Sequence, residues 1–154
     1  MYKENDKINE FRLLDSENNE ISINDFNGIV VLFFYSKDNT SACTCQALGY
    51  KELYDEFKNL NATIIGISKD SPSSHKKFKE KYELPYILLS DKNKDVIRSF
   101  DLIKKKKMYG KDVEGTLRSS FIIKNNIILK ANYNVIAKED ATKVLEELRN
   151  LNNQ

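Results

Sequence analysis

Three apolar runs, separated by segments of helical character, most constrain how this chain can fold. The runs are GIVVLFFY (28–35), ATIIGIS (62–68) and PYILLSD (85–91). Short runs dominated by apolar residues are typical of strands covered on both faces, as in a parallel sheet. Between them, segment 41–60 repeats apolar residues at helical intervals, and segment 71–84 opens with a Ser-Pro pair that suits a helix start. This alternation of strand and helix predicts the α/β fold class.

Shorter patterns extend this core on both sides. The remaining expected elements are an N-terminal β-hairpin (10–23), a short helix (94–100), a polar connector (104–117), a second hairpin (119–124 and 127–135) and an amphipathic last helix (138–151). Together they predict a central mixed β-sheet flanked by helices. Because no repeat or linker interrupts the pattern, we expect residues 1–154 to form a single domain.

The composition excludes several classes of protein. The 154 residues are 40% hydrophobic and 31% charged with a net charge of +2, so nothing global indicates nucleic acid or a membrane as partner. No stretch approaches the roughly 18 apolar residues of a membrane span, and the polar start MYKENDKINE predicts no signal peptide. Two cysteines are too few for a secreted disulfide framework, which favours a cytoplasmic protein. The basic run Lys104–Lys107 and the only histidine, His75, are both expected on the solvated surface.

The only two cysteines, Cys43 and Cys45, follow the first apolar run, where a strand should end and a helix begin. A helix that starts near Ser41 places Cys43 in its first turn. There the unpaired backbone N–H groups and the positive end of the helix dipole favour the thiolate, which is the reactive form. Thr40 is well placed to cap the helix or to offer its hydroxyl to the sulfur or a bound oxygen.

Helical spacing separates the two thiols. Cys43 falls on the apolar stripe that continues through Ala47 and Tyr50, whereas Cys45 lies ~200° away on the side that carries Glu52. Cys43 is therefore expected to face the core and Cys45 the solvent. These local features alone leave three interpretations open: a catalytic pair, one catalyst beside an incidental surface thiol, or a buried cysteine that packs as a small hydrophobe.

At this point the chain resembles a known family. Segment 34–44, FYSKDNTSACT, is similar to the active-site segment of peroxiredoxins of the PrxQ group (bacterioferritin comigratory protein), which typically reads F-Y-P-K-D-N-T-P-G-C-T. The similarity continues in order through FRLLDSENNEISINDFNG, GISKDSPSSHKKFKEKYELPYILLSD and KKMYGKDVEGTLRSSFIIK. The resemblance implies a thioredoxin-like fold and reduction of hydrogen peroxide and organic hydroperoxides. It also implies recycling by thioredoxin or another thiol, and a monomer or weak homodimer.

The resemblance assigns roles to individual residues. The peroxidatic cysteine of the family falls on Cys43, its threonine on Thr40, and the arginine of its G-x-x-R-[ST]-[ST]-F segment on Arg118. Gln46 matches a polar position and is a possible helper. An arginine beside the thiol would favour the thiolate and donate hydrogen bonds to the peroxide oxygens, and the product at the cysteine would be a sulfenic acid.

The sequence departs from the family pattern at several positions. Ser36 stands where the family has proline, and Ser41 and Ala42 stand where it has proline and glycine, which alters the loop but removes no reacting group. The resolving cysteine of many PrxQ proteins falls on Leu48, whereas the second thiol here is Cys45.

Three routes of recycling remain open for Cys43. Cys45 could resolve it after the helix start unwinds, an external thiol could resolve it, or Cys45 could bridge to another subunit. The alternative functions are a thioredoxin-like disulfide oxidoreductase, which normally requires C-x-x-C, and a non-enzymatic redox sensor. No metal, flavin or nucleotide motif is present, so no cofactor is expected.

Overall fold

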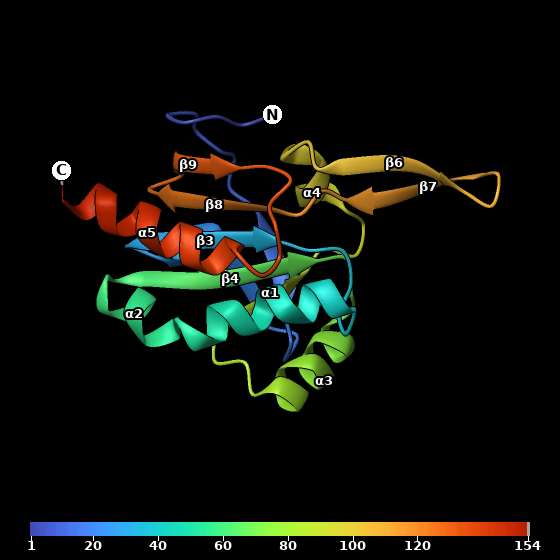
Figure 1. The fold of residues 1–154 in the computed structure, drawn as a ribbon, viewed down its shortest axis with the longest axis horizontal. Coiled ribbons are helices and arrows are strands. Elements are labelled where there is room, and N and C mark those ends of the chain that lie inside the picture. The colour runs from blue at the N-terminus through green and yellow to red at the C-terminus, as the bar shows by residue number, and fades with distance from the viewer. Residues whose placement is uncertain (154) are drawn as a thin grey trace.

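A seven-stranded mixed sheet forms the centre of the computed structural model, which describes residues 1–153 (Figure 1). In chain order the elements are β1 (Arg12–Asp15), β2 (Glu20–Ser22), a 3₁₀ turn (Ile23–Asp25), β3 (Ile29–Phe34), α1 (Ser41–Glu52), α2 (Tyr54–Asn59), β4 (Ala62–Ser68), α3 (Pro72–Tyr82), β5 (Ile87–Ser90), α4 (Asp95–Ser99), β6 (Ile103–Met108), β7 (Lys111–Thr116), β8 (Ser119–Lys124), β9 (Ile127–Asn132) and α5 (Asp140–Asn152). The strand order in the sheet is β2-β1-β5-β4-β3-β8-β9. Strands β3, β4 and β5 are parallel, while β1 and β8 run antiparallel to their neighbours. The predicted mixed sheet and N-terminal hairpin are thus confirmed.

Strand β3 is buried on both faces, as its continuous apolar run predicts. Val31 and Phe33 belong to a core cluster that includes residues of α1, α2, α3 and α5, whereas Leu32 and Phe34 belong to a second cluster with residues of α4. All four side chains are fully buried. The helices therefore cover both faces of the sheet, with α1 and α5 together on one of them (Figure 1).

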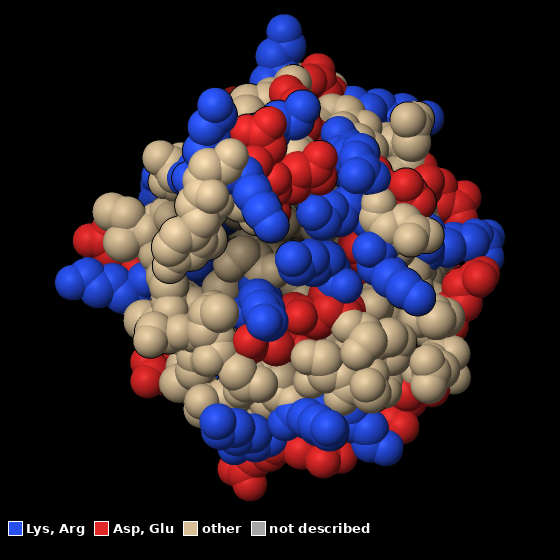
Figure 2. All heavy atoms as spheres, turned by 90° about the vertical axis from the view of Figure 1, so that its right-hand side faces the viewer, with Lys and Arg blue, Asp and Glu red and all other residues tan. Residues whose placement is uncertain are grey.

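Segment 104–117, expected as a polar connector, instead forms most of a β-hairpin. Strands β6 and β7 pair with each other in a separate two-stranded sheet that projects from the body of the molecule (Figure 1). Tyr109 and Gly110 form the two-residue turn, and both have positive φ, as type I′ hairpin turns require. The strands are almost wholly exposed, so they carry no alternation of apolar and polar residues. Figure 2 views the molecule from this side and shows basic side chains gathered among acidic ones.

His75 was expected on the surface and is instead completely buried. It lies on α3, three residues before Phe78, which is also buried. Phe78 belongs to the core cluster that contains Val31 and Phe33. Its ring is accommodated because both nitrogens face hydrogen-bond partners, Asp38 and the backbone of Leu89. Within residues 1–153, no helix has the length and apolar character that crossing a membrane requires.

Candidate active site

Cys43 lies where β3 ends and α1 begins, in the first turn of the helix. Thr40 occupies the N-cap position with an extended backbone, but its side chain makes no capping bond; its hydroxyl donates instead to the carbonyl of Lys37 at 3.1 Å. Asn39 has a φ of 65°, a left-handed conformation that asparagine tolerates well. The tight loop between the strand and the helix thus delivers Cys43 to the core side of α1, where it is 1% exposed.

Two side chains contact the sulfur of Cys43. Arg118, between β7 and β8, donates from Nη2 to Sγ at 3.3 Å, and the hydroxyl of Ser36 lies 3.4 Å from Sγ. Burial by itself raises the pKa of this thiol. Hydrogen bonding by Ser36, Thr40, the Lys37 backbone and Arg118 outweighs the burial, so the net pKa of Cys43 is lowered from its ordinary value. The site therefore favours the nucleophilic thiolate.

Removing the Ser36 hydroxyl is expected to raise the pKa of Cys43. Because only the thiolate reacts, the acid limb of the pH–rate profile should move to higher pH in Ser36→Ala, and activity should be lost over a pH window in which the wild type remains active. The ultraviolet absorbance of the thiolate, followed against pH, measures the shift directly. Ser41→Ala, an exposed serine in the same loop-to-helix segment, is the matched control, and an unchanged profile in Ser36→Ala would contradict the assignment.

The guanidinium of Arg118 is held in place by the helix that carries the thiol. Its Nη1 donates to Oε1 of Gln46 at 2.7 Å, and Gln46 is fully buried one turn beyond Cys43. The amide of Gln46 donates in turn from Nε2 to the carboxylate of Asp140 at 2.9 Å. The structure thus brings together Cys43, Thr40, Arg118 and Gln46, the four residues that the sequence singled out around one thiol.

Cys45 stands apart from this group. Its side chain is exposed while that of Cys43 is buried, as the helical spacing predicts, and both cysteines are free thiols. Helix α1 is continuous from Ser41 to Glu52, so the two thiols point to different sides of an intact helix. A bond between them therefore requires the first turn of α1 to unwind.

Two contributors to the site escaped the sequence analysis. Ser36 was noted only as a departure from the family proline, although a hydroxyl two residues after a buried strand can reach the adjacent helix terminus. Asp140 lies 94 residues from Gln46 and carries no local signal except that it is an acidic residue at the start of a predicted helix. Only the packing of α5 against α1 reveals it.

A buried polar cluster anchors the loop before Cys43 from behind. Asp38 accepts hydrogen bonds from Tyr35 at 2.6 Å and from Ser74 at 2.8 Å, pairs with His75 at 2.8 Å, and donates its backbone N–H to Asp70 at 2.8 Å. Ligand atoms of Asp38, Asp70 and His75 lie within 4.8 Å of one another, a spacing that could suit a metal ion. Each of these groups already has hydrogen-bond partners, so the cluster is accounted for as a brace for the loop.

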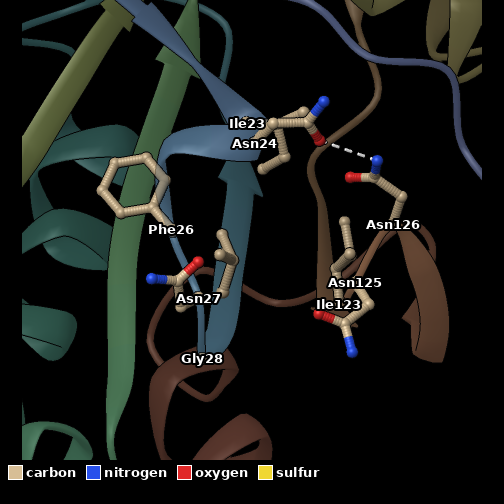
Figure 3. A pocket seen from close by; sticks show the side chains of 9 residues that line it. Ile23, Asn24, Phe26, Asn27, Gly28, Ile123, Asn125 and Asn126 are labelled. Carbon is tan, nitrogen blue, oxygen red and sulfur yellow. Dashed lines mark hydrogen bonds between the residues drawn. The ribbon is translucent and has the colours of Figure 1, made fainter.

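A separate pocket of about 260 Å³ lies at the other end of β3, far from the thiol. Figure 3 shows side chains that line it, with Asn126 donating to Asn24 across the rim at 2.7 Å. Gly28, just before β3, lines this pocket, whereas Cys43 follows the opposite end of the same strand. The residues that line this pocket are apolar side chains, asparagines and one glycine.

Comparison with known proteins agrees with this geometry. Residues 5–132 match the AhpC/TSA family. The chain is 44% identical over 141 residues to a putative peroxiredoxin Bcp of Helicobacter pylori, covering 90% of this chain and 93% of the relative. It is 35% identical over 147 residues to the peroxiredoxin Bcp of Bacillus subtilis, covering 94% of each.

Solved structures of related proteins have the same fold. A PrxQ mutant of Xylella fastidiosa superposes with a TM-score of 0.91 at 33% identity, covering 97% of this chain and 96% of that one. The bacterioferritin comigratory protein of Xanthomonas campestris, described for its alkyl peroxide reduction activity, superposes with a TM-score of 0.85 at 33% identity, covering 90% of each chain. The fold is therefore thioredoxin-like, and the chain belongs to the AhpC/TSA family and, within it, to the Bcp/PrxQ peroxiredoxins.

Proposed function

We propose that this peroxiredoxin reduces hydrogen peroxide and organic hydroperoxides through the thiolate of Cys43. The sulfur attacks one peroxide oxygen, the O–O bond breaks, and the leaving oxygen takes up a proton to depart as water or an alcohol. Cys43 is thereby oxidised to a sulfenic acid. The observation that carries the proposal is the contact of Arg118 with the Cys43 sulfur at 3.3 Å, in a site where the pKa of this buried thiol is lowered.

The neighbouring groups have distinct proposed roles. Arg118 stabilises the thiolate and donates to the leaving oxygen as negative charge develops on it. Thr40 and the free N–H groups of the first turn of α1 orient the peroxide for attack in line with the O–O bond. Gln46 holds Arg118 in place. Arg118 already donates to the reacting sulfur and Gln46 already accepts from Arg118, whereas the Thr40 hydroxyl has to turn from the Lys37 carbonyl to reach the peroxide.

A thiol reductant must return the sulfenic acid to the thiol, and we propose thioredoxin in this role. External resolution is favoured over resolution by Cys45, because α1 is intact and directs Cys45 to solvent. We further propose that residues 1–154 act as one domain, as a monomer or weak homodimer, in the reducing cytoplasm, where two free cysteines persist.

Rapid-mixing measurement of peroxide consumption by the reduced protein tests the proposed function. One equivalent of hydroperoxide should be consumed per protein, with one oxygen added at Cys43 by mass spectrometry, and excess peroxide should be turned over when thioredoxin and its reductase are supplied. Oxidation that stops after one equivalent with every thiol donor would instead indicate a redox sensor. Oxidation without any change at Cys43 would contradict the proposed site.

The Cys45→Ser variant separates the routes of recycling. With external resolution, the variant should retain peroxide turnover with added thioredoxin, and the sulfenic acid should persist in both proteins when no reductant is present. An intramolecular disulfide in the wild type, seen as a loss of two hydrogens that disappears in Cys45→Ser, would show instead that the helix unwinds and that Cys45 resolves Cys43.

A further inference from the structure

Asp140, at the start of α5, is a carboxylate enclosed by hydrogen-bond donors from two other elements. It is 1% exposed. Its Oδ2 accepts from Nε2 of Gln46 at 2.9 Å and from the hydroxyl of Tyr50 at 2.6 Å, while its Oδ1 accepts from the hydroxyl of Ser120 at 2.7 Å. Two of these donors come from α1 and one from β8. A buried charge is stable only when it is satisfied in this way.

The chemistry of the partners gives this chain of contacts a direction. A carboxylate can only accept hydrogen bonds and a guanidinium can only donate them. The amide of Gln46 lies between Asp140 and Arg118, so only one of its two orientations satisfies both neighbours: Nε2 toward Asp140 and Oε1 toward Arg118. The flipped amide would face a donor with its NH₂ group and an acceptor with its oxygen. Asp140 therefore determines which atom Gln46 presents to Arg118.

The donors around Asp140 are themselves rigid. The ring of Tyr50 stacks on that of Phe33 with centroids 4.5 Å apart, and Ser120 lies directly opposite Phe33 in the sheet. Burial, followed by the charge of Asp140, raises the pKa of Tyr50 well above its ordinary value, so its hydroxyl stays protonated and available as a donor. The carboxylate is thus held by the sheet and α1 together, rather than by a mobile side chain.

We propose that Asp140 is a positioning residue for peroxide reduction, which orients the amide of Gln46 so that one arm of the Arg118 guanidinium is occupied and the other faces the sulfur of Cys43. The contacts run without a gap from Oδ2 of Asp140 through Gln46 to Nη1 of Arg118, and from Nη2 to the thiolate. Asp140 touches neither the sulfur nor the peroxide and acts only through this relay. The inference rests on the proposed function of Cys43 and adds a residue that no motif around the cysteine contains.

Substitution of Asp140 by asparagine tests the relay with little change in shape. The new amide is neutral and only one of its two terminal atoms can accept, so it holds Gln46 more weakly than the carboxylate does and Arg118 is less firmly placed. We expect peroxide consumption at neutral pH to fall roughly tenfold or more, because small displacements of a positioning group have effects of this size. The acid limb of the pH–rate profile should move to higher pH.

The double variant Asp140→Asn, Gln46→Glu provides a rescue. The introduced carboxylate at position 46 accepts from Arg118 on one oxygen and from the new amide at position 140 on the other, so the polarity of the relay is restored. If Asp140 acts through position 46, the double variant should recover most of the rate and of the pH profile that Asp140→Asn loses. A purely structural role of Asp140 predicts no recovery, because the second buried substitution would then only add its own loss of stability to that of the first.

Asp91→Asn is the matched control. Asp91 is another buried aspartate; it accepts the backbone N–H of Ile97 at 2.8 Å and contacts no residue of the relay. This variant should lose stability without moving the pH profile of the thiol. The rate at which iodoacetamide alkylates Cys43, measured against pH, reports the thiolate without any peroxide, so it remains informative even if the proposed function fails. An alkylation profile unchanged in Asp140→Asn, or a double variant no better than the single one, would overturn the proposal.

Discussion

Replacement of Cys43 by serine is expected to reduce peroxide consumption by the protein to the uncatalysed background. The serine hydroxyl is far less acidic than a thiol, so the contacts from Arg118 and Ser36 that favour a thiolate cannot generate an equivalent nucleophile at neutral pH. The substitution exchanges one small, nearly isosteric side chain for another at a buried position, so the fold should be retained. Rapid-mixing kinetics with hydrogen peroxide and an organic hydroperoxide measure the loss.

Cys45→Ser is the matched control, because it removes the only other thiol of the chain. In that variant the first oxidation step should proceed at the wild-type rate, since Cys45 lies on the exposed side of α1. Thermal unfolding of both variants distinguishes a chemical loss from a folding defect. If Cys43→Ser consumed peroxide as fast as the wild type, the proposed thiol peroxidase mechanism at this residue would be contradicted.

The central sheet could be predicted from the sequence because its signal is strong and local. The runs that became β3, β4 and β5 are apolar on both faces, and the intervening helices have apolar stripes and recognisable starts. The same reasoning located Cys43 and Cys45 on opposite sides of α1. The strand order could not be predicted from these patterns, because they do not say which strands are neighbours; β1, for example, pairs with β5, about 75 residues along the chain.

The β6–β7 hairpin could not be predicted from hydrophobic pattern for a physical reason. Its strands bury almost nothing, so the pairing depends on backbone hydrogen bonds and on the tight turn at Tyr109 and Gly110. The turn was the only local signal, and the lysine run beside it suggested a solvated loop. Burial, which makes strands recognisable in sequence, is absent from this element.

His75 was misplaced because its neighbours in sequence are polar while its neighbours in space are not. It lies three residues before the buried Phe78, on the inward stripe of α3, and this spacing was the signal that could have placed it. The partner that makes its burial possible, Asp38, is 37 residues away in the loop that leads to Cys43. No local pattern relates the two residues.

The His75–Asp38 pair is expected to make a large contribution to stability. Nε2 of His75 faces the carbonyl of Leu89 at 3.1 Å, and a carbonyl can only accept, so this nitrogen carries a proton. Nδ1 faces Oδ2 of Asp38 at 2.8 Å, while the Tyr35 hydroxyl donates to the other carboxylate oxygen. The ring therefore joins α3 to β5 and, through Asp38, to the loop before Cys43.

His75→Ala should therefore lower the free energy of unfolding by about 3–5 kcal/mol, because it removes a fully buried side chain and leaves the Asp38 carboxylate without one of its hydrogen-bond partners in the interior. Urea denaturation measures the change, and Lys77→Ala, on the exposed side of the same helix, should stay within about 0.5 kcal/mol of the wild type. Since His75 is the only histidine of the chain, nitrogen NMR of its ring observes the contact without interference, and Nε2, which faces the Leu89 carbonyl, should carry a proton. A cost no larger than that of an ordinary cavity would show that Asp38 is held by its hydroxyl donors alone and that the loop before Cys43 does not depend on His75.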